Sequence, residues 1–520
     1  MKLDDQDPNS KKVKSGARFI PIIESLSDGG SAPEIIKIDP LVLLRYAPES
    51  FYFQRSSGDD TSYTPKETIL AFDPFESLRF RHGYATIANA QGNTVLRGSP
   101  FQVLSSRMEY YKTLPDPRFP FFQGGALGYF AYDSIRYLEN KLIESPGNLQ
   151  KISDGFDAEF MFFKKLIIFD HGHQRVLFVS GIDPRTDSIE QGLKQAYLEI
   201  EQLRELYLSA AVRSSVSLAP LDDCPEVKIE EMKSLLGKEQ YLVGVRKLKE
   251  HIGCGDIFQA VLSDRFTATF DGDPGDLFNV LSRLSPSPYQ FYFPLNKKTF
   301  LGASPEMLLR IHGDTLETHP IAGTRRRGKT SEEDLSLELE LMDDMKEKAE
   351  HIMLVDLARN DIGRVSKSGT VRVDSFMKTR RFSSVMHLVS RVLGDKKEGI
   401  SSIEALAACF PAGTLSGAPK IRAMQLISEL EPEPRNVYGG AMVAASFTGD
   451  LDSCIAIRSL EVGNGQVTLQ VGAGIVADSI PEIEYEEVQH KSQMVRKALA
   501  LANQNKMRIK STFDSKVGEK

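Results

Sequence analysis

Strand-like alternation of apolar and polar residues dominates the first third of the chain. Residues 51–57, 85–98 and 159–181 are rich in aromatic and β-branched side chains, and connections containing Gly or Asn separate them. This composition is typical of β-strands. The last run is broken at Asp170–His173, which predicts a hairpin. Residues 186–212 instead repeat apolar side chains every three or four positions, which predicts a helix.

The rest of the chain mixes strand-like and helical segments without a regular βαβ order. Helical periodicity covers residues 239–254, 332–355, 400–410 and 481–503. Strand-like patterns cover residues 255–270, 371–382, 384–395 and 436–478, and the sequence GNGQ at 463–466 predicts a hairpin inside the last of them. Many strands with a few long helices predict an α+β fold.

Composition divides the chain into four parts. Residues 1–18 are polar and predict a flexible N-terminal arm, and residues 213–228 combine Ser, Pro and Asp without a period, as linkers do. We therefore expect an N-terminal region over residues 19–225 and a larger region over residues 226–505. Residues 506–520 are expected to form a C-terminal tail.

Charge and cysteine content exclude several classes of protein. The net charge of −7 offers no electrostatic footprint for nucleic acid. The four cysteines are far apart and form no CxxC pair, which favours reduced thiols over disulfides or zinc. The N-terminus has no apolar signal-peptide core, and no stretch approaches the ~20 apolar residues that span a bilayer. We expect a soluble, cytoplasmic protein.

Two acidic pairs are candidates for a metal site. Glu347 and Glu350 are three residues apart in a predicted helix, and so are Glu484 and Glu487. Because residues at i and i+3 share a helical face, each pair can direct two carboxylates to one place. Carboxylates are ligands of Mg²⁺, which leaves positions open for an anionic substrate. The alternative is a solvated helix face with neighbouring lysines.

Further candidates lie within apolar strands. His387 could be a general acid or base, or a hydrogen-bonded core residue. Arg458 requires an anion if it is buried, either a protein carboxylate or a substrate. Gly472 and Gly474 form a GxG element that could expose backbone N–H groups. The chain has no P-loop and no complete GxGxxG, so a nucleotide-binding function lacks support.

The segment 410–420, FPAGTLSGAPK, is rich in small residues and precedes a helical pattern. Such a segment could bring backbone N–H groups and a helix N-terminus close to an anion. The alternative is an ordinary loop that enters a helix.

Ordered motifs from about residue 253 to 497 resemble the chorismate-utilising enzymes, most closely the large (aminase) subunits of anthranilate synthases. The motifs are GDIFQAV, SPSPYQFYF, FLGASPE, PIAGTRRRG, EHIMLVDLARNDIGRV, VMHLVSRV, GTLSGAPKIRAMQLI, YGGA, CIAIRS and GAGIVADSIPEIEYEEVQHK. FFQGGALGYFAYD is similar to the family's N-terminal domain. The resemblance implies large antiparallel sheets in a sandwich-like core with helices outside, a regulatory-type N-terminal region and a chorismate-binding catalytic region.

The resemblance implies a Mg²⁺-dependent carbon–oxygen lyase. It would convert chorismate and ammonia to anthranilate and pyruvate through aminodeoxyisochorismate. Two positions separate this activity from its relatives. Aminodeoxychorismate synthases typically have a nucleophilic lysine where this chain has Ala322, and isochorismate- and salicylate-forming relatives use a lysine where it has Gln259. Both residues favour anthranilate synthase.

The resemblance also assigns roles to individual residues. The predicted metal ligands are Glu350 and Glu487, with Glu347 and Glu484 in support. The predicted catalytic positions are His387, as the base that removes the C2 proton, with Thr324 and Gln259. The predicted substrate contacts are Gly323, Thr324, Tyr438, Arg458, Gly472, Ala473, Gly474 and Lys491. Thr414 and Ser416 of the 410–420 segment are possible further polar contacts.

The family usually draws ammonia from a separate glutamine amidotransferase subunit, which implies a heterodimer or heterotetramer. Its tryptophan feedback site corresponds to Ser56, Pro288, Tyr289 and Gln290, with Arg55 where Glu is usual. An added positive charge would oppose the ammonium group of tryptophan. We therefore expect weak or absent tryptophan inhibition, which would suit supply of anthranilate to secondary metabolism.

Two other functions remain open at this point. An aminodeoxychorismate synthase would form a different product from the same substrates. A non-catalytic homologue that binds an amidotransferase would not need the glutamate pairs, His387 and Arg458.

Overall fold

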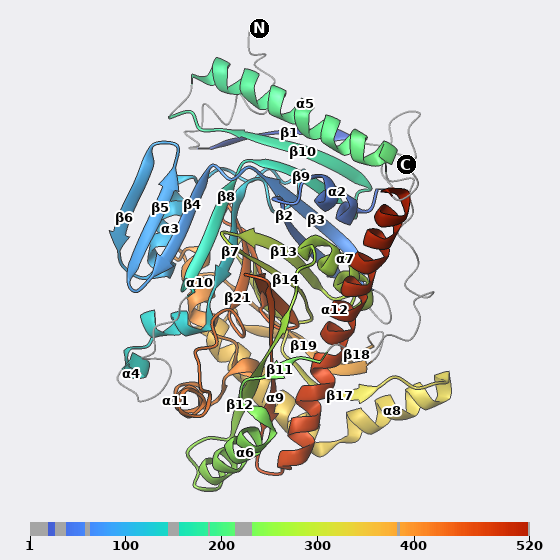
Figure 1. The fold of residues 1–520 in the computed structure, drawn as a ribbon. Coiled ribbons are helices and arrows are strands. Elements are labelled where there is room, and N and C mark those ends of the chain that lie inside the picture. Colours follow the sequence, from blue (N-terminus) through green and yellow to red (C-terminus); the bar gives the residue numbers. More distant parts are fainter. Residues whose placement is uncertain are drawn as a thin grey trace.

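Two antiparallel β-sheets of 12 strands each form the centre of the computed structural model (Figure 1). The structure describes residues 19–26, 38–57, 63–143, 155–185, 188–213, 231–381 and 385–517, and side chains only as far as residue 504. The predicted arm at 1–18 and almost all of the predicted linker lie outside these residues.

The first sheet combines strands from both halves of the chain. Its order is β1 (Ile20–Leu26), β10 (Arg175–Ile182), β9 (Lys165–Asp170), β3 (Thr64–Phe72), β2 (Phe51–Ser57), β13 (Tyr289–Leu295), β14 (Lys298–Ser304), β23 (Ser459–Gly463), β24 (Gln466–Ile475), β12 (Gln259–Thr269) and β11 (Lys233–Ser234), and β20 (Gly417–Ala418) pairs with β12.

The second sheet has the same mixed origin. Its order is β17 (Ile321–Arg326), β19 (Val385–Asp395), β16 (Thr315–Thr318), β15 (Met307–His312), β22 (Leu451–Ile455), β21 (Ala441–Ser446), β7 (Gly125–Phe130), β8 (Ala158–Phe163), β4 (Glu76–Arg81), β5 (Tyr84–Asn89) and β6 (Gly92–Arg97), and β18 (Arg372–Arg381) pairs with β19.

Helices cover the outer faces of the two sheets (Figure 1). They are α2 (Pro40–Tyr46), α3 (Pro100–Tyr110), α4 (Asn140–Ile143), α5 (Ile189–Arg213), α6 (Gly237–Gly253), α7 (Pro274–Leu284), α8 (Ser331–Asp343), α9 (Met345–Gly363), α10 (Ser402–Cys409), α11 (Lys420–Leu430) and α12 (Pro481–Val517), with 3₁₀ turns η2 (Tyr132–Tyr137) and η5 (Gly413–Leu415). No helix of the described residues is long and apolar enough to cross a membrane.

Aromatic side chains fill the space between the sheets. The rings of Phe51 and Phe163, from opposite sheets, have centroids 4.9 Å apart, and so do those of Phe300 and Tyr129. Burial of rings of this size dominates core energetics. The chain therefore forms the predicted α+β sandwich with helices outside.

The predicted boundary at residue 225 does not coincide with a boundary between sheets. Strand β2 pairs with β13, and β7 pairs with β21, so both sheets contain strands from either side of this position. At the other end, α12 continues to Val517, through most of the segment predicted as a tail.

Most of the predicted local elements are confirmed. The hairpins at Asp170–His173 and at GNGQ join β9 to β10 and β23 to β24. Cys254, Cys409 and Cys454 are free thiols, and Cys224 lies outside the described residues.

One helix prediction was wrong. Residues 332–355 form two helices instead of one, because Asp344 has extended backbone angles and accepts hydrogen bonds from the N–H groups of Lys346 and Glu347. A side chain that caps new N–H groups starts a new helix. The break places the predicted Glu347 and Glu350 in the first turns of α9.

Candidate active site

A cavity of about 670 Å³ brings together most of the predicted site residues. Both sheets, α9, α12 and the 410–420 segment contribute to its wall. The predicted residues in this wall are Gln259, Gly323, Thr324, Glu347, Glu350, His387, Tyr438, Arg458, Gly472, Gly474, Glu484, Glu487 and Lys491. Ala473 is the exception, because its side chain is fully buried in the core on the other side of β24.

The cavity wall contains the carboxylates of both predicted pairs, Glu347 and Glu350 on α9 and Glu484 and Glu487 on α12. Burial raises the pKa of Glu350, and the charges of Glu347 and Glu487 raise it further. Burial and the charge of Glu487 also raise the pKa of Glu484. The two pairs therefore act on one another, as carboxylates around one cation site would.

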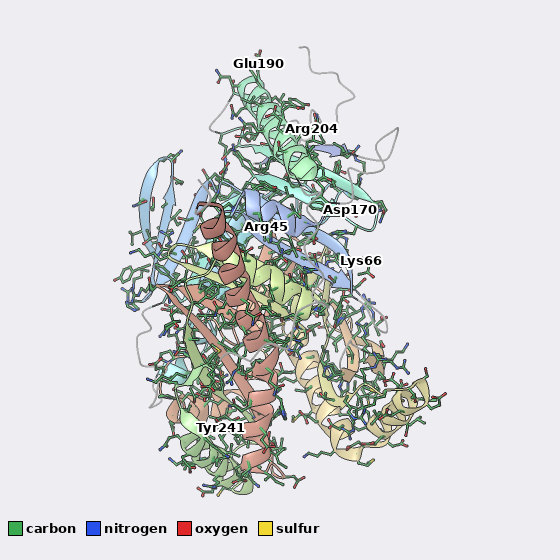
Figure 2. All side chains as sticks on the ribbon, turned by 45° about the vertical axis from the view of Figure 1, so that its right-hand side comes forward. Arg45, Lys66, Asp170, Glu190, Arg204 and Tyr241 are labelled. Carbon is green, nitrogen blue, oxygen red and sulfur yellow. The ribbon has the colours of Figure 1, made fainter. Side chains whose placement is uncertain are left out.

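Packing at the start of α12 fixes one of these pairs. Tyr241 of α6, labelled in Figure 2, lies with its ring centroid 5.7 Å from that of Tyr485. Tyr485 follows Glu484 directly, and buried Val488 follows Glu487. Because Tyr485 and Val488 anchor one side of the helix, Glu484 and Glu487 are held on the side that faces the cavity.

Two cations of the chain contact the carboxylates. Lys491 Nζ lies 2.7 Å from Glu487 Oε1 and 3.2 Å from the carbonyl oxygen of Gly472. Arg325 Nη1 lies 3.2 Å from Glu347 Oε1. Among the residues that the structure describes, no three His, Cys, Asp or Glu side chains are grouped closely enough to hold a metal ion by themselves.

The donor chemistry nevertheless fits Mg²⁺. This ion uses one or two protein carboxylates and completes its octahedron with water and substrate oxygens, so it does not need three protein ligands. Glu350 and Glu487 supply one carboxylate from each helix. Burial of Glu350 and the nearby charges of Glu347 and Glu487 make this a place where a divalent cation would relieve unfavourable charge.

His387 is held in a defined orientation by β17. Its Nδ1 lies 2.9 Å from the carbonyl oxygen of Gly323 and 3.0 Å from Thr324 Oγ1. Burial, together with the positive charges of Arg458 and Lys491, lowers the pKa of His387 to about 4, against the hydrogen bond with Gly323. The imidazole is therefore neutral at pH 7. With Nδ1–H donated to the Gly323 carbonyl, Nε2 is the basic nitrogen.

The geometry at Gly323 explains why this hydrogen bond forms. The register between β17 and β19 shifts between Ala322 and Thr324, and Gly323 has a φ of +68°. A Cβ atom there would come within 3.1 Å of Leu341 and 3.2 Å of Glu347 Oε2. Only glycine adopts this backbone at low cost, and the bulge turns its carbonyl oxygen toward His387.

Arg458 is a cation in the cavity wall, and its side chain is exposed to the cavity. Burial lowers its pKa, and Tyr63 and Glu306 partly oppose this effect. None of the ion pairs in the described part of the chain involves Arg458. The sequence analysis left two partners for Arg458, a protein carboxylate or a substrate. Because no described carboxylate forms an ion pair with it, this arrangement favours a substrate carboxylate.

Glu306 is a site residue that the sequence analysis missed. It lies in the same cavity, and burial raises its pKa to about 7 against the hydrogen bond from Thr414 and the charges of Lys491 and Arg458. Thr414 Oγ1 donates to Glu306 Oε1 at 2.7 Å. A carboxyl that keeps its proton near neutral pH can act as a general acid. The only feature of the sequence that could have pointed to Glu306 is an acidic residue shortly after a strand.

The 410–420 segment contributes to the cavity, but not as a helix N-terminus. Thr414 and Leu415 line the cavity, whereas Ser416 is buried and donates to the carbonyl of Ala412. The following helix α11 forms as predicted, and Lys420 in its first turn pairs with Asp361 at 3.1 Å. No residue of α11 is in the wall of the cavity.

The residues of the predicted feedback site lie together on β2, on β13 and at Pro288 directly before β13, outside the cavity wall. The N–H of Ser56 donates to the carbonyl of Pro288 at 2.7 Å, and Tyr289 is opposite Arg55 in the register. Gln290 is opposite Gln54, and its Oε1 lies 3.5 Å from Gln54 Nε2. Arg55 itself pairs with Asp452 and Glu67, at 3.4 and 3.3 Å.

A second cavity of about 800 Å³ shares Tyr438 and Gln470 with the first. Most of its charged residues are already engaged: Arg265 pairs with Glu433, Lys298 with Glu461, and Arg435 with Glu431. None of the predicted metal or catalytic residues lines it, so we assign the chemistry to the first cavity.

Comparison with known proteins agrees with the resemblance seen in the motifs. The sequence profile of one family, described as chorismate binding enzyme, matches residues 49–497. The chain belongs to this family. Among curated family members, the anthranilate synthase component 1 of Bacillus subtilis (strain 168) is 38% identical over 499 residues, which cover 93% of this chain and 92% of that protein.

Solved structures of chorismate-binding family members confirm the predicted fold. The crystal structure of anthranilate synthase component I from Streptococcus pneumoniae has a TM-score of 0.71 and 32% identity, and the match covers 90% of this chain and 100% of that one. A putative 2,3-dihydroxybenzoate-specific isochorismate synthase from Bacillus anthracis has a TM-score of 0.61 at 22% identity, covering 88% and 99%. The second likeness concerns the fold alone.

Proposed function

We propose that this chorismate-binding enzyme is the large subunit of an anthranilate synthase. It converts chorismate and ammonia to anthranilate and pyruvate through aminodeoxyisochorismate, with Mg²⁺ as cofactor. The observation that carries the proposal is the single cavity in which two glutamate pairs, the neutral base His387, the protonatable Glu306 and the cation Arg458 meet. The relatives named anthranilate synthase component 1 support it.

Charge complementarity supports binding of a dianion such as chorismate. Arg458, Tyr438 and the backbone at Gly472 and Gly474 would hold the enolpyruvyl carboxylate. Glu350 and Glu487 would hold Mg²⁺, which supplies Lewis-acid assistance and positive charge for the ring carboxylate. Donors fixed before the substrate arrives stabilise developing charge without reorganisation.

The acid and the base act in successive steps of the proposed reaction. Ammonia attacks C2, the ring double bonds shift, and Glu306 gives its proton to the C4 hydroxyl, which leaves as water. The attacking nitrogen loses one proton to solvent. His387 Nε2 then takes the C2 proton, and the electrons of that C–H bond complete the aromatic ring while the C3–O bond breaks. The enolpyruvate that leaves takes up a proton at its methylene carbon and becomes pyruvate. The pKa values near 7 for Glu306 and near 4 for His387 suit these opposite tasks.

Two side chains favour ammonia as the nucleophile. Gln259 lines the cavity with its Nε2 3.5 Å from Glu350 Oε1, and it cannot activate water as a lysine would. Ala322 precedes the Gly323 bulge and offers no amine to attack the ring. At these two positions the chain therefore lacks the lysines that an aminodeoxychorismate synthase or isochorismate synthase function would use.

The proposal predicts that the purified chain uses ammonia but not glutamine. With chorismate, Mg²⁺ and an ammonium salt, we expect anthranilate fluorescence and an equal amount of pyruvate. With glutamine in place of ammonium, we expect no product until a glutamine amidotransferase subunit is added, because the proposed heteromer divides the two reactions. Glutamine-dependent turnover by the chain alone would contradict the proposed partner.

The position of Arg55 is the ground for proposing weak tryptophan inhibition. Its guanidinium adds a positive charge to the predicted feedback site, and its ion pairs with Asp452 and Glu67 offset part of that charge. The ammonium group of tryptophan would meet this charge, which opposes binding. We expect the ammonia-dependent rate to be unchanged by micromolar tryptophan, and an enzyme of this kind would suit supply of anthranilate to secondary metabolites. Inhibition at micromolar tryptophan would refute this part.

A further inference from the structure

A buried ion pair lies directly behind the wall of the cavity. Glu431 follows the end of α11, and Arg435 lies four residues later, with exposures of 5% and 3%. Arg435 Nη2 lies 2.6 Å from Glu431 Oε1, and Nε lies 2.8 Å from Oε2, so the contact is bidentate. Glu431 Oε1 also accepts from the N–H and the hydroxyl of Ser263, at 2.9 and 2.7 Å.

The guanidinium of Arg435 connects three segments that line the cavity. Its Nη1 donates to the carbonyl of Leu415 at 2.6 Å, and its Nη2 donates to the carbonyl of Val261 at 2.7 Å. Its Cζ lies 5.6 Å from the ring centroid of Tyr438, with Tyr132 at 4.7 Å as a second ring partner. Leu415, Val261 and Tyr438 are all part of the cavity wall, and Arg435 is not.

We propose that Arg435 is a positioning residue for chorismate binding, which rests on the function proposed above. It fixes the 410–420 segment, β12 and the ring of Tyr438 relative to one another from behind the wall. Glu431 and Ser263 hold the guanidinium in turn. The Tyr438 hydroxyl lies beside Gly472, where a Cβ atom would be 3.0 Å from it, so a displaced ring would disturb the proposed carboxylate contacts.

Only arginine has the geometry for this role. Its rigid fork of donors reaches two carbonyls and a carboxylate at once, whereas the lysine ammonium is a point charge. A buried ion pair is weak evidence for stability by itself, because apolar residues of equal volume often replace one without loss. A pair that also joins three wall segments affects ligand geometry, and weakening one charge-assisted contact to a ligand costs about tenfold in affinity.

The test is Arg435→Lys, with Arg107→Lys as the matched control. Arg107, whose side chain is 19% exposed, forms a bidentate pair with the buried carboxylate of Glu76, on α3 and β4, outside the cavity wall. We expect both variants to fold with lower Tm. Arg435→Lys should weaken chorismate binding by about tenfold, measured by calorimetry with Mg²⁺ and by KM, with a smaller change in kcat. Arg107→Lys should leave both constants unchanged.

A second variant covers the case in which Arg435→Lys does not fold. Glu431→Asp keeps every charge but shortens the arm that holds Arg435, so it should weaken chorismate binding in the same direction. Wild-type binding in either folded variant would overturn the positioning role. Calorimetry measures binding without turnover. If the wild-type chain bound chorismate but formed no anthranilate, the proposed function would be refuted, and the binding data would still decide the positioning role of Arg435.

Discussion

Replacing Glu350 by Gln is expected to lower kcat/KM for chorismate by about 10³-fold, the scale of a lost contribution to transition-state charge stabilisation. The amide keeps the volume but removes one of the two carboxylates proposed to hold Mg²⁺. Burial and the charges of Glu347 and Glu487 raise the pKa of Glu350, and a divalent cation beside its carboxylate would offset both effects. Glu487→Gln should have an effect of similar size.

The control for this prediction is Glu486→Gln, because Glu486 is exposed on the same helix as Glu487 and outside the cavity wall. We expect it to match the wild type. Chelation with EDTA should abolish wild-type activity, excess Mg²⁺ should restore it, and Glu350→Gln should need more Mg²⁺ for any residual rate. Full turnover in Glu350→Gln at the wild-type Mg²⁺ requirement would contradict the metal assignment.

Replacing Glu306 by Gln should lower kcat by about 10²- to 10⁴-fold, the usual contribution of a general acid. The amide still accepts the hydrogen bond from Thr414 but cannot give a proton to the C4 hydroxyl. Because burial raises the pKa of Glu306 to about 7, the protonated form is present below that pH and is lost above it. The wild-type rate at saturating chorismate should therefore fall as pH rises through about 7.

Binding measurements separate this role from a structural one. Glu306→Gln replaces a carboxyl by a neutral group of equal shape, so chorismate affinity and Tm should stay close to wild type. Glu306→Asp should be slower than the wild type, but its rate should still fall as pH rises, with the midpoint of that fall at a different pH. If Glu306→Gln retained activity within threefold of wild type, another group would have to be the acid.

The local pattern of apolar and polar residues predicted most of the helices and strands, but not which distant strands pair. Period-two runs and the turns at Asp170–His173 and GNGQ specify hairpins, because both strands are close in sequence. Pairing of β2 with β13 joins residues more than 200 positions apart, and alternation alone carries no information about such a partner. The break at Asp344 was missed because an acidic residue inside an acidic helix gives no separate capping signal.

The same distinction applies to the site. The i, i+3 spacing predicted that each glutamate pair shares a face, and only the sheets determine that α9 and α12 meet at one cavity. His387 and Arg458 stood out as polar residues in apolar strands. Glu306 and Arg435 did not, because their roles come from burial and from contacts with Thr414, Leu415 and Val261, which are distant in sequence.

The most direct test of the proposed activity is mass spectrometry of the products that the purified chain forms from chorismate, Mg²⁺ and ¹⁵N-ammonium chloride. The proposal predicts ¹⁵N-anthranilate and an equal amount of pyruvate, both absent in Glu487→Gln. Isochorismate without nitrogen, or aminodeoxychorismate with no pyruvate released, would contradict it.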